Sequence, residues 1–283
     1  DLYTSDYSNA KKGQTIKGTV YTDNIIGSDY NDKIYTSPLG NNLESVTGGK
    51  GNDTVYFGRG NNVFYFDNGD GNDVLNISKN TDSVLLRMQG DSENKSFERK
   101  GNDLIIKRNL EGTDDSVTLK NYFKQTEEHY KLASEGYMDE ILNSEEFDEL
   151  RTIKAPKENK SATMNGTFLN DIIYGSNKND KIYTNGGDDT VSAGKGNDTI
   201  HVKNGMVDLN FKQGDGSDTV YIQDKNSSVY LNFDGAPTFV AEISKTFSYP
   251  SITFPNAAYL PCNWLLVSLL SVHIIKNWLD ALL

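Results

Sequence analysis

Short apolar pairs alternate with glycine-rich polar stretches along much of this chain, at a spacing of nine residues. The stretch GGKGNDTVY at 48–56 has near-copies at 27–35, 175–183 and 193–201. Each copy places a polar loop before two or three strand-forming residues. The eighth residue of a unit is predicted to point inward from a very short strand. These eighth residues include Ile34, Val55, Phe64, Ile182, Val191, Ile200 and Val220.

The nine-residue units form two series. The first series has units starting at Gly18, Gly27, Leu39, Gly48, Phe57 and Asn68. The second series has units starting at Gly166, Gly175, Thr184, Ala193, Val202 and Gln213. Residues 18–36 match residues 166–184 at a constant offset of 148, so one array is present in duplicate. One unit makes a loop and a strand. Two units therefore make one coil of about 18 residues, and loops two units apart stack on the same edge.

The sixth position of most units is an aspartate. Because loops of neighbouring coils stack, these carboxylates are expected to face one another and repel. A hard cation bound by carboxylate and loop-carbonyl oxygens would convert this repulsion into cross-linking, and Ca²⁺ suits such sites better than octahedral, partly hydrated Mg²⁺. The predicted metal-site residues are Asp23, Asp32, Gly48, Gly49, Gly51, Asp53, Asp73, Asp171, Asp180, Gly186, Gly187, Asp189, Gly194, Gly196, Asp198 and Asp218.

The second array predicts which sites are shared. Three aspartates are expected to share sites between successive coils on one edge, with Asp198 in the middle. Asp171 is expected to pair with Asp189 on the other edge. Val207 occupies the sixth position of the next unit, so that edge should lose its next site. Asp198, which would serve two sites, is predicted to be the most sensitive position.

The units resemble the G-G-x-G-x-D-x-U-x nonapeptide of the repeats-in-toxin (RTX) family. The resemblance covers about 15–125 and 161–233. It implies a right-handed parallel β-roll that binds several Ca²⁺ ions. It also implies a secreted protein of Gram-negative bacteria, exported in one step through a type I channel. Known members are cytolysins, proteases, lipases and adhesins, so the motif is specific for calcium and weakly specific for the activity of the parent protein.

The fold class that follows is all-β: two right-handed parallel β-rolls joined by a β-hairpin cap and an acidic helical linker. The first roll is expected at 1–77 and the second at 161–233. Residues 78–125 contain a strand at 83–88, a hairpin turning at Gly101-Asn102 and a further strand in 114–123. They resemble the segment that covers the end of the roll in RTX cytolysins. An unrelated small β-domain is the alternative.

The segment 126–160 has ten acidic and five basic residues and no repeat glycines. Met138, Ile141 and Leu142 recur at helical spacing, and Ser144 is suited to cap a helix. We therefore expect an acidic helical linker, with a partner-binding helix as the alternative.

The last segment, 234–283, is an atypical apolar tail. Residues 257–275 carry no formal charge but include Pro261 and Asn263. Their length permits a membrane helix, which the proline and the polar residues disfavour. The readings, in order of preference, are a non-native or displaced reading frame, an export signal and a membrane anchor.

The net charge of −12 argues against nucleic acids and anionic membranes as partners and is compatible with cations. The single cysteine, Cys262, excludes an internal disulfide. The three histidines lie too far apart in the sequence for a zinc motif, so we expect no enzyme within these residues. The chain begins at Asp1 without a signal peptide, and we interpret it as a fragment of a longer protein.

The expected function is the calcium-binding export-and-folding module of a secreted, extracellular bacterial protein. The segment 78–125 favours a cytolysin as the parent. A calcium-stiffened adhesive or structural surface protein and the export module of a secreted hydrolase are the alternatives. The expected partners are calcium ions and the type I secretion apparatus, with a host cell surface as a further candidate. Membrane contact is considered for the tail alone.

Overall fold

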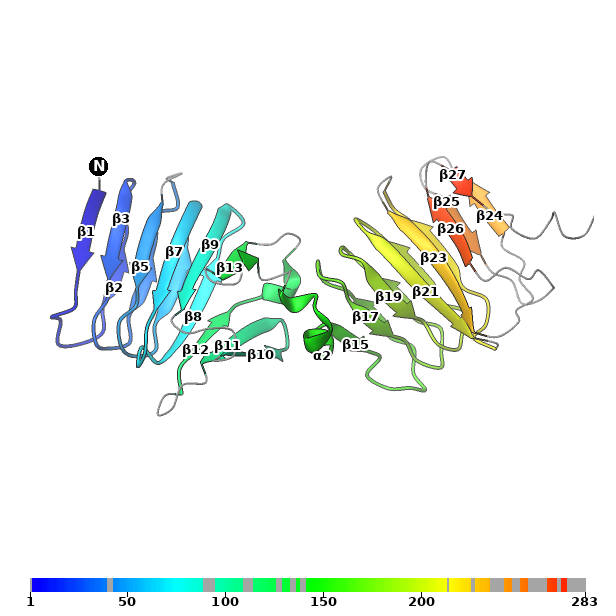
Figure 1. The fold of residues 1–283 in the computed structure, drawn as a ribbon, viewed down its shortest axis with the longest axis horizontal. Helices are drawn as coiled ribbons and strands as arrows, with labels where there is room; N and C mark the ends of the chain where they lie inside the picture. Colours follow the sequence, from blue (N-terminus) through cyan, green and yellow to red (C-terminus); the bar gives the residue numbers. More distant parts are fainter. Residues whose placement is uncertain are drawn as a thin grey trace, which may run out of the picture. The chain divides into compact units, whose positions relative to one another are not determined.

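The structure is a computed structural model of the chain. It describes residues 2–39, 43–88, 95–108, 114–125, 129–132, 136–137, 141–212, 214–224, 227–234, 242–245, 250–253, 264–268 and 271–273. The chain divides into two compact units, Asp1–Leu150 and Arg151–Leu283. Each unit is a parallel β-solenoid in which successive repeat strands alternate between two sheets (Figure 1).

The first unit contains two seven-stranded sheets. Pairs between repeat strands are parallel. One sheet has the order β1 (Leu2–Asp6), β3 (Thr22–Ile26), β5 (Glu44–Thr47), β7 (Gly60–Phe66), β9 (Thr81–Met88), β13 (Tyr130–Leu132) and β14 (Gly136–Tyr137). The other has the order β2 (Thr15–Lys17), β4 (Lys33–Tyr35), β6 (Thr54–Phe57), β8 (Asn72–Ile77), β12 (Ser116–Leu119), β11 (Asp103–Arg108) and β10 (Lys95–Lys100).

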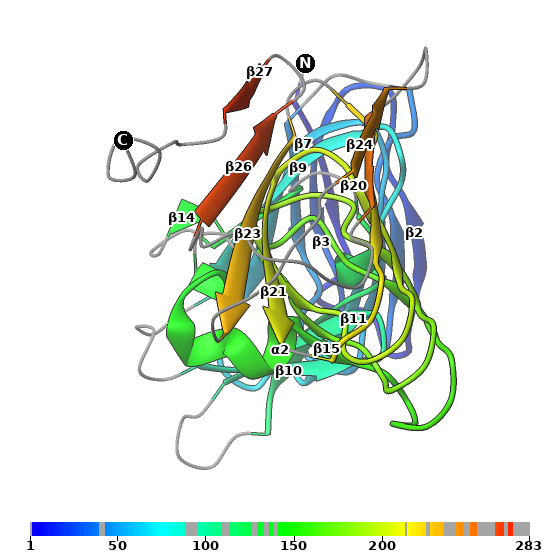
Figure 2. The same ribbon diagram turned by 90° about the vertical axis from the view of Figure 1, so that its right-hand side faces the viewer.

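The second unit is built in the same way. Figure 2 shows β26 beside β23 and β23 beside β21 in one of its sheets. That sheet has the order β15 (Thr152–Lys154), β17 (Ile172–Tyr174), β19 (Asp189–Ser192), β21 (Met206–Lys212), β23 (Ser228–Asp234), β26 (Trp264–Ser268) and β27 (Ser271–His273). The other has the order β16 (Thr163–Asn165), β18 (Lys181–Tyr183), β20 (Thr199–Val202), β22 (Thr219–Ile222), β25 (Pro250–Thr253) and β24 (Glu242–Lys245).

The apolar eighth residues of the repeats form the core between the two sheets. Ile182 lies opposite Met164 on one side and Ile200 on the other, so equivalent residues stack coil upon coil. All seven eighth-position residues named above have no exposed side-chain surface, as predicted. Neighbouring strand residues alternate between buried and partly exposed, because successive side chains point to opposite faces.

The segment after the first array continues the sheets. The strand and hairpin predicted there are present: β9 begins at Thr81, and β10 and β11 pair antiparallel with Lys100 opposite Asp103. β9 and β12 pair parallel with the repeat strands β7 and β8. The two sheets of the solenoid therefore continue past residue 77 into the segment 78–125, so the predicted boundary does not mark the end of the solenoid.

Within the segment 126–160, the described residues are partly helical and partly strand. Ile141 and Leu142 are helical, as their spacing predicted. A 3-10 turn, η3 (Glu145–Phe147), with Ser144 at its N-cap, runs into a four-residue helix, α2 (Asp148–Arg151). Other described parts of the segment form strands instead: β13 pairs parallel with β9 and β15 pairs parallel with β17. An unpaired sheet edge offers backbone hydrogen bonds, and these override weak helical spacing. The predicted helical residue Met138 lies outside the described residues.

The tail contributes strands to the second unit. β25 pairs antiparallel with β22, and β26 pairs antiparallel with β23. Within the uncharged stretch 257–275, the described residues 264–268 and 271–273 are strands, and the others, including Cys262, lie outside the described residues. Among the helices that the structure describes, none is long and apolar enough to span a membrane.

Candidate calcium centre

The position-6 aspartates form ladders along the edges of the solenoids, which confirms that equivalent loops stack. In the first unit the backbone N–H of Asp32 donates to Oδ1 of Asp53 at 2.7 Å. The backbone N–H of Asp53 donates in turn to Oδ1 of Asp73 at 2.8 Å. One oxygen of each acceptor carboxylate is thus held by the backbone of the preceding coil rather than set against another carboxylate.

The second unit carries a ladder on both edges. On one edge the N–H of Asp180 donates to Oδ1 of Asp198 at 2.7 Å, and Asp198 donates to the next aspartate at 2.8 Å. On the other edge the N–H of Asp171 donates to Oδ1 of Asp189 at 2.8 Å. Val207 lies opposite Asp189, so the ladder of aspartates stops there, as the sequence predicted.

Five ladder carboxylates keep their second oxygen without a hydrogen-bond partner. The side chains are at most 2% exposed, so water does not reach these oxygens freely. A buried carboxylate oxygen without a donor is costly, and it is the arrangement expected where a cation supplies the missing interaction. The unpartnered atoms are the Oδ2 atoms of Asp53, Asp73, Asp189, Asp198 and Asp218.

The other four predicted aspartates satisfy their carboxylates within their own loops. In the loop 27–32, Ser28 donates its backbone N–H to Oδ2 of Asp32 and its hydroxyl to Oδ1 at 3.0 Å. Ser176 makes the same two bonds to Asp180. Threonine replaces the serine in the remaining two loops. The four acceptors are Asp23, Asp32, Asp171 and Asp180.

Burial raises the pKa of the unpartnered carboxyls far above the ordinary value. The pKa is raised to about 7 for Asp53 and to about 8 for Asp198, first by burial and then by the charges of neighbouring aspartates. The pKa of Asp73 and that of Asp189 are each raised to about 9, again mainly by burial. Burial also raises the pKa of Asp218 to about 7. In the absence of a cation, burial therefore shifts these groups toward the protonated form.

The glycines bring backbone carbonyls close to the ladder. A Cβ on Gly48 would lie 2.3 Å from Oδ2 of Asp53, so only glycine leaves room for that oxygen. A Cβ on Gly71 would lie 2.1 Å from the carbonyl oxygen of Gly51 in the loop below. The second unit repeats this contact, with the carbonyl oxygen of Gly196 lying 1.7 Å from a Cβ built on Gly216. Stacked loops thus approach one another through carbonyl oxygens.

This donor set fits calcium. Carboxylate and carbonyl oxygens are the ligands of a hard cation, and Ca²⁺ accepts six to eight of them in flexible geometry. Among the described residues, no group of three or more His, Cys, Asp or Glu side chains is placed to hold a metal by itself.

Two further acidic residues accept backbone N–H groups of the repeats and were not predicted. Glu44 accepts the N–H of Asp23 through Oε2 at 3.0 Å, while its Oε1 has no partner. Burial raises the pKa of Glu44 to about 7. Its place at the sixth position of the unit starting at Leu39 was a signal that could have identified it. Asp115 accepts the N–H groups of Gly69 (2.8 Å) and Gly71 (3.2 Å), and no repeat pattern marks it.

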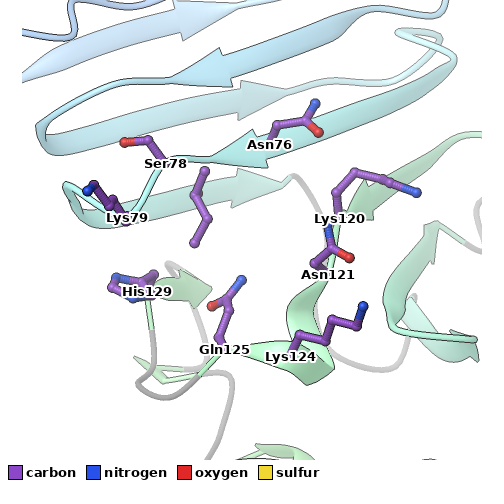
Figure 3. A pocket seen from close by; sticks show the side chains of 9 residues that line it. Asn76, Ser78, Lys79, Lys120, Asn121, Lys124, Gln125 and His129 are labelled. Atoms are coloured by element: carbon purple, nitrogen blue, oxygen red, sulfur yellow. The ribbon is translucent and has the colours of Figure 1, made fainter.

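The first unit also contains a cavity of about 440 Å³ away from the ladders (Figure 3). Lys79, Lys120, Lys124 and His129 line it together with three amide side chains, Ile77 and Ser78, and none of the described lining residues is a carboxylate. The Lys120 ammonium is paired with Asp103. A cavity of this character does not suit a cation, so it is separate from the calcium centre.

Comparison with known protein families agrees with the geometry. The family model for the RTX calcium-binding nonapeptide repeat matches the chain in four copies, over residues 17–37, 45–64 and 165–200. The matched segments include ladder loops of both units. No match was found among curated proteins. The repeat is a structural calcium-binding unit rather than a catalytic one. The chain thus carries the repeats that define the RTX calcium-binding nonapeptide family.

Proposed function

We propose that this chain is a calcium-binding RTX module of a secreted bacterial protein, which folds on extracellular Ca²⁺ after type I export. The observation that carries the proposal is the set of five buried aspartate oxygens that have no donor. They occur in glycine-rich loops whose carbonyl oxygens lie between the stacked coils. A cation at these loops satisfies the oxygens and joins each coil to the next.

The same residues explain why folding should require the metal. Without it, Asp198 and Asp218 are buried acids on consecutive coils. Binding free energy at a site that exists only in the folded state adds directly to folding free energy. Extracellular calcium modules bind at about 10⁻⁴–10⁻³ M. Low cytosolic calcium would thus leave the chain unfolded for export, and external calcium would fold it.

The resemblance of 78–125 to the post-repeat segment of cytolysins supports a toxin as the parent protein. Asp115 of this segment accepts the N–H groups of Gly69 and Gly71 in the loop 68–73, a contact that supports a role of the segment in closing the glycine loops of the first unit. Such a closure protects the end of a solenoid, which otherwise presents unpaired groups.

The proposal is tested by titrating the metal-free chain with Ca²⁺ and recording far-ultraviolet circular dichroism. We expect a transition from a disordered to a β-sheet spectrum at a midpoint of about 10⁻⁴–10⁻³ M. Mg²⁺ at the same concentrations is the control and should have little effect, because it prefers octahedral, hydrated sites. A complete β-sheet spectrum in the presence of a chelator would contradict calcium-driven folding.

A further inference from the structure

The nine loops that end in a ladder aspartate fall into two backbone classes. In five loops the second and fourth residues both have positive φ, the left-handed region that favours glycine. The pairs are Gly49 (88°) and Gly51 (116°), Gly69 (83°) and Gly71 (96°), Asn185 (69°) and Gly187 (82°), Gly194 (91°) and Gly196 (134°), and Gly214 (91°) and Gly216 (119°). These are the five loops whose aspartates have an unpartnered Oδ2. We call them the open loops.

Four other loops, which we call the closed loops, carry serine or threonine at the second position and have no positive φ at the second or fourth position. There the second residue uses its N–H and its hydroxyl to bind both carboxylate oxygens. Its hydroxyl oxygen also accepts the N–H of the fourth residue, as in Lys178 to Ser176 at 3.1 Å. The closed loops are 18–23, 27–32, 166–171 and 175–180.

We infer that the residues at the second and fourth loop positions decide whether a loop binds calcium, and that the closed loops bind none. In a closed loop the protein itself supplies the donors that the cation supplies in an open loop. Ser176 donates to both oxygens of Asp180, and the backbone N–H of Ala162 donates to Oδ1 as well, so neither oxygen of this buried carboxylate is left without a donor. This inference rests on the proposed calcium-binding function and narrows it to particular loops.

The positions of the closed loops give the inference a structural consequence. In each array the two closed loops are the first two, one on each edge of the solenoid, and open loops follow them. The first coil of each array is therefore held by its own hydrogen bonds. It provides a metal-independent surface on which the calcium-dependent coils stack. Of the nine aspartates predicted from the sequence, this assigns four to a structural role without metal.

Adding a site is the sharpest test, because a gain cannot arise from misfolding. The double variant Ser176→Gly/Lys178→Gly converts the loop 175–180 from GSNKND to GGNGND, next to the open loop 193–198. Equilibrium dialysis of the full chain against Ca²⁺ counts the bound ions. We expect one more bound ion than in the unchanged chain. The matched variant Ser176→Ala/Lys178→Ala removes the same side chains but does not favour positive φ, and it should add none.

The first unit offers an independent repeat of the test. Ser28→Gly/Tyr30→Gly converts the loop 27–32 to GGDGND and should also add one ion. An unchanged count in both glycine variants, with the β-sheet spectrum of the unchanged chain in calcium, would overturn the inference while leaving calcium binding intact. A gain in the alanine variant equal to that in the glycine variant would overturn it too. If the unchanged chain binds no Ca²⁺ at millimolar concentration, the proposed function itself fails.

Discussion

At the scale of the residue, each ladder aspartate acts through two separate oxygens. Oδ1 of Asp198 accepts the backbone N–H of Asp180 and so fixes the spacing between two coils. Oδ2 of the same residue is buried and has no partner. The hydrogen bond to Oδ1 and the proposed metal contact of Oδ2 are therefore separate, and substitution can distinguish them.

The first prediction concerns Asp198 and Asp171. Asp198→Ala removes both oxygens from an open loop and should raise the midpoint calcium concentration about tenfold or more, because calcium affinity depends on the number of charged ligands. Asp171→Ala affects a closed loop and should change that midpoint by about twofold or less. Calcium titrations followed by circular dichroism compare the two variants. Asp198→Asn is the control, since it preserves an acceptor for Asp180 and loses only the charge. Equal midpoints for Asp198→Ala and Asp171→Ala would show that the open and the closed loop do not differ in calcium binding.

The second prediction is a pH dependence that reverses with the metal. In the absence of calcium, the folded-state pKa of Asp53 is about 7 and that of Asp73 about 9, against about 4 in an unfolded chain. Groups whose pKa is raised on folding bind more protons in the folded state, so they stabilise it fully below about pH 4. That stability is lost as the pH rises through about 7 to 9.

With calcium the direction is opposite, because the metal competes with protons for the same carboxylates. The midpoint calcium concentration should fall as the pH is raised from about 6 to about 9. Circular dichroism in chelator and calcium titrations at several pH values measure both effects. A calcium midpoint independent of pH over this range would show that the buried carboxylates do not bind the ion.

At the scale of the element, the loop and the strand of a repeat unit need different residues, and the nine-residue pattern supplies both. The strand needs one inward apolar residue, and Ile200 or Val220 meets it with complete burial. The loop needs a chain reversal with carbonyls close to the next coil, which glycine permits. Outer-face side chains add a smaller contribution: the rings of Tyr183, His201 and Tyr221 stack across three coils at 4.6 and 5.1 Å between centroids.

The third prediction compares two glycines of this element. Gly196 has φ of +134°, and a Cβ there would lie 2.6 Å from the carbonyl carbon of Lys178. Gly214 has φ of +91° with no heavy atom within 4 Å of such a Cβ. Gly196→Ala should therefore raise the calcium midpoint more than Gly214→Ala, by about tenfold, because it adds a clash between coils to the backbone strain. Similar calcium midpoints for the two variants would mean that the close approach of neighbouring coils at Gly196 does not affect calcium binding.

At the scale of the whole molecule, the chain consists of two compact units, and the boundary between them in the sequence falls after Leu150. Each has its own apolar core and its own ladders. In the second unit the core runs from Met164 through Ile182 and Ile200 to Leu231. A unit with its own core and metal sites contains what it needs to fold separately.

The fourth prediction is that the two units respond to calcium independently. Chains comprising residues 1–150 and 151–283 should each gain a β-sheet spectrum on addition of calcium. The sum of their spectra should reproduce that of the full chain. Asp198→Ala in the full chain should leave the transition of the first unit unchanged, which separates the two transitions. Failure of either isolated unit to fold in calcium would show that the units stabilise each other.

Much of the fold follows from the sequence alone. The nine-residue period, the buried eighth residues such as Val55 and the stacking of equivalent loops all depend on the local alternation of glycine, aspartate and β-branched residues. Val207 could likewise be identified as the end of one aspartate ladder. Local chemistry determines these features, because each repeat meets only its neighbours, which have the same pattern.

Only the tertiary structure showed which aspartates have a carboxylate oxygen without a hydrogen-bond partner, and which segments pack against the ends of the two arrays. Asp32 and Asp53 occupy the same repeat position, yet only the loop conformation shows that the first is held by Ser28 and the second has an unpartnered Oδ2. Asp115 reaches the loop of Gly69 from 46 residues away, and β15 joins a sheet where a helical linker was expected. Hydrogen-bond partners and sheet edges belong to the folded chain, so a linear pattern does not contain them.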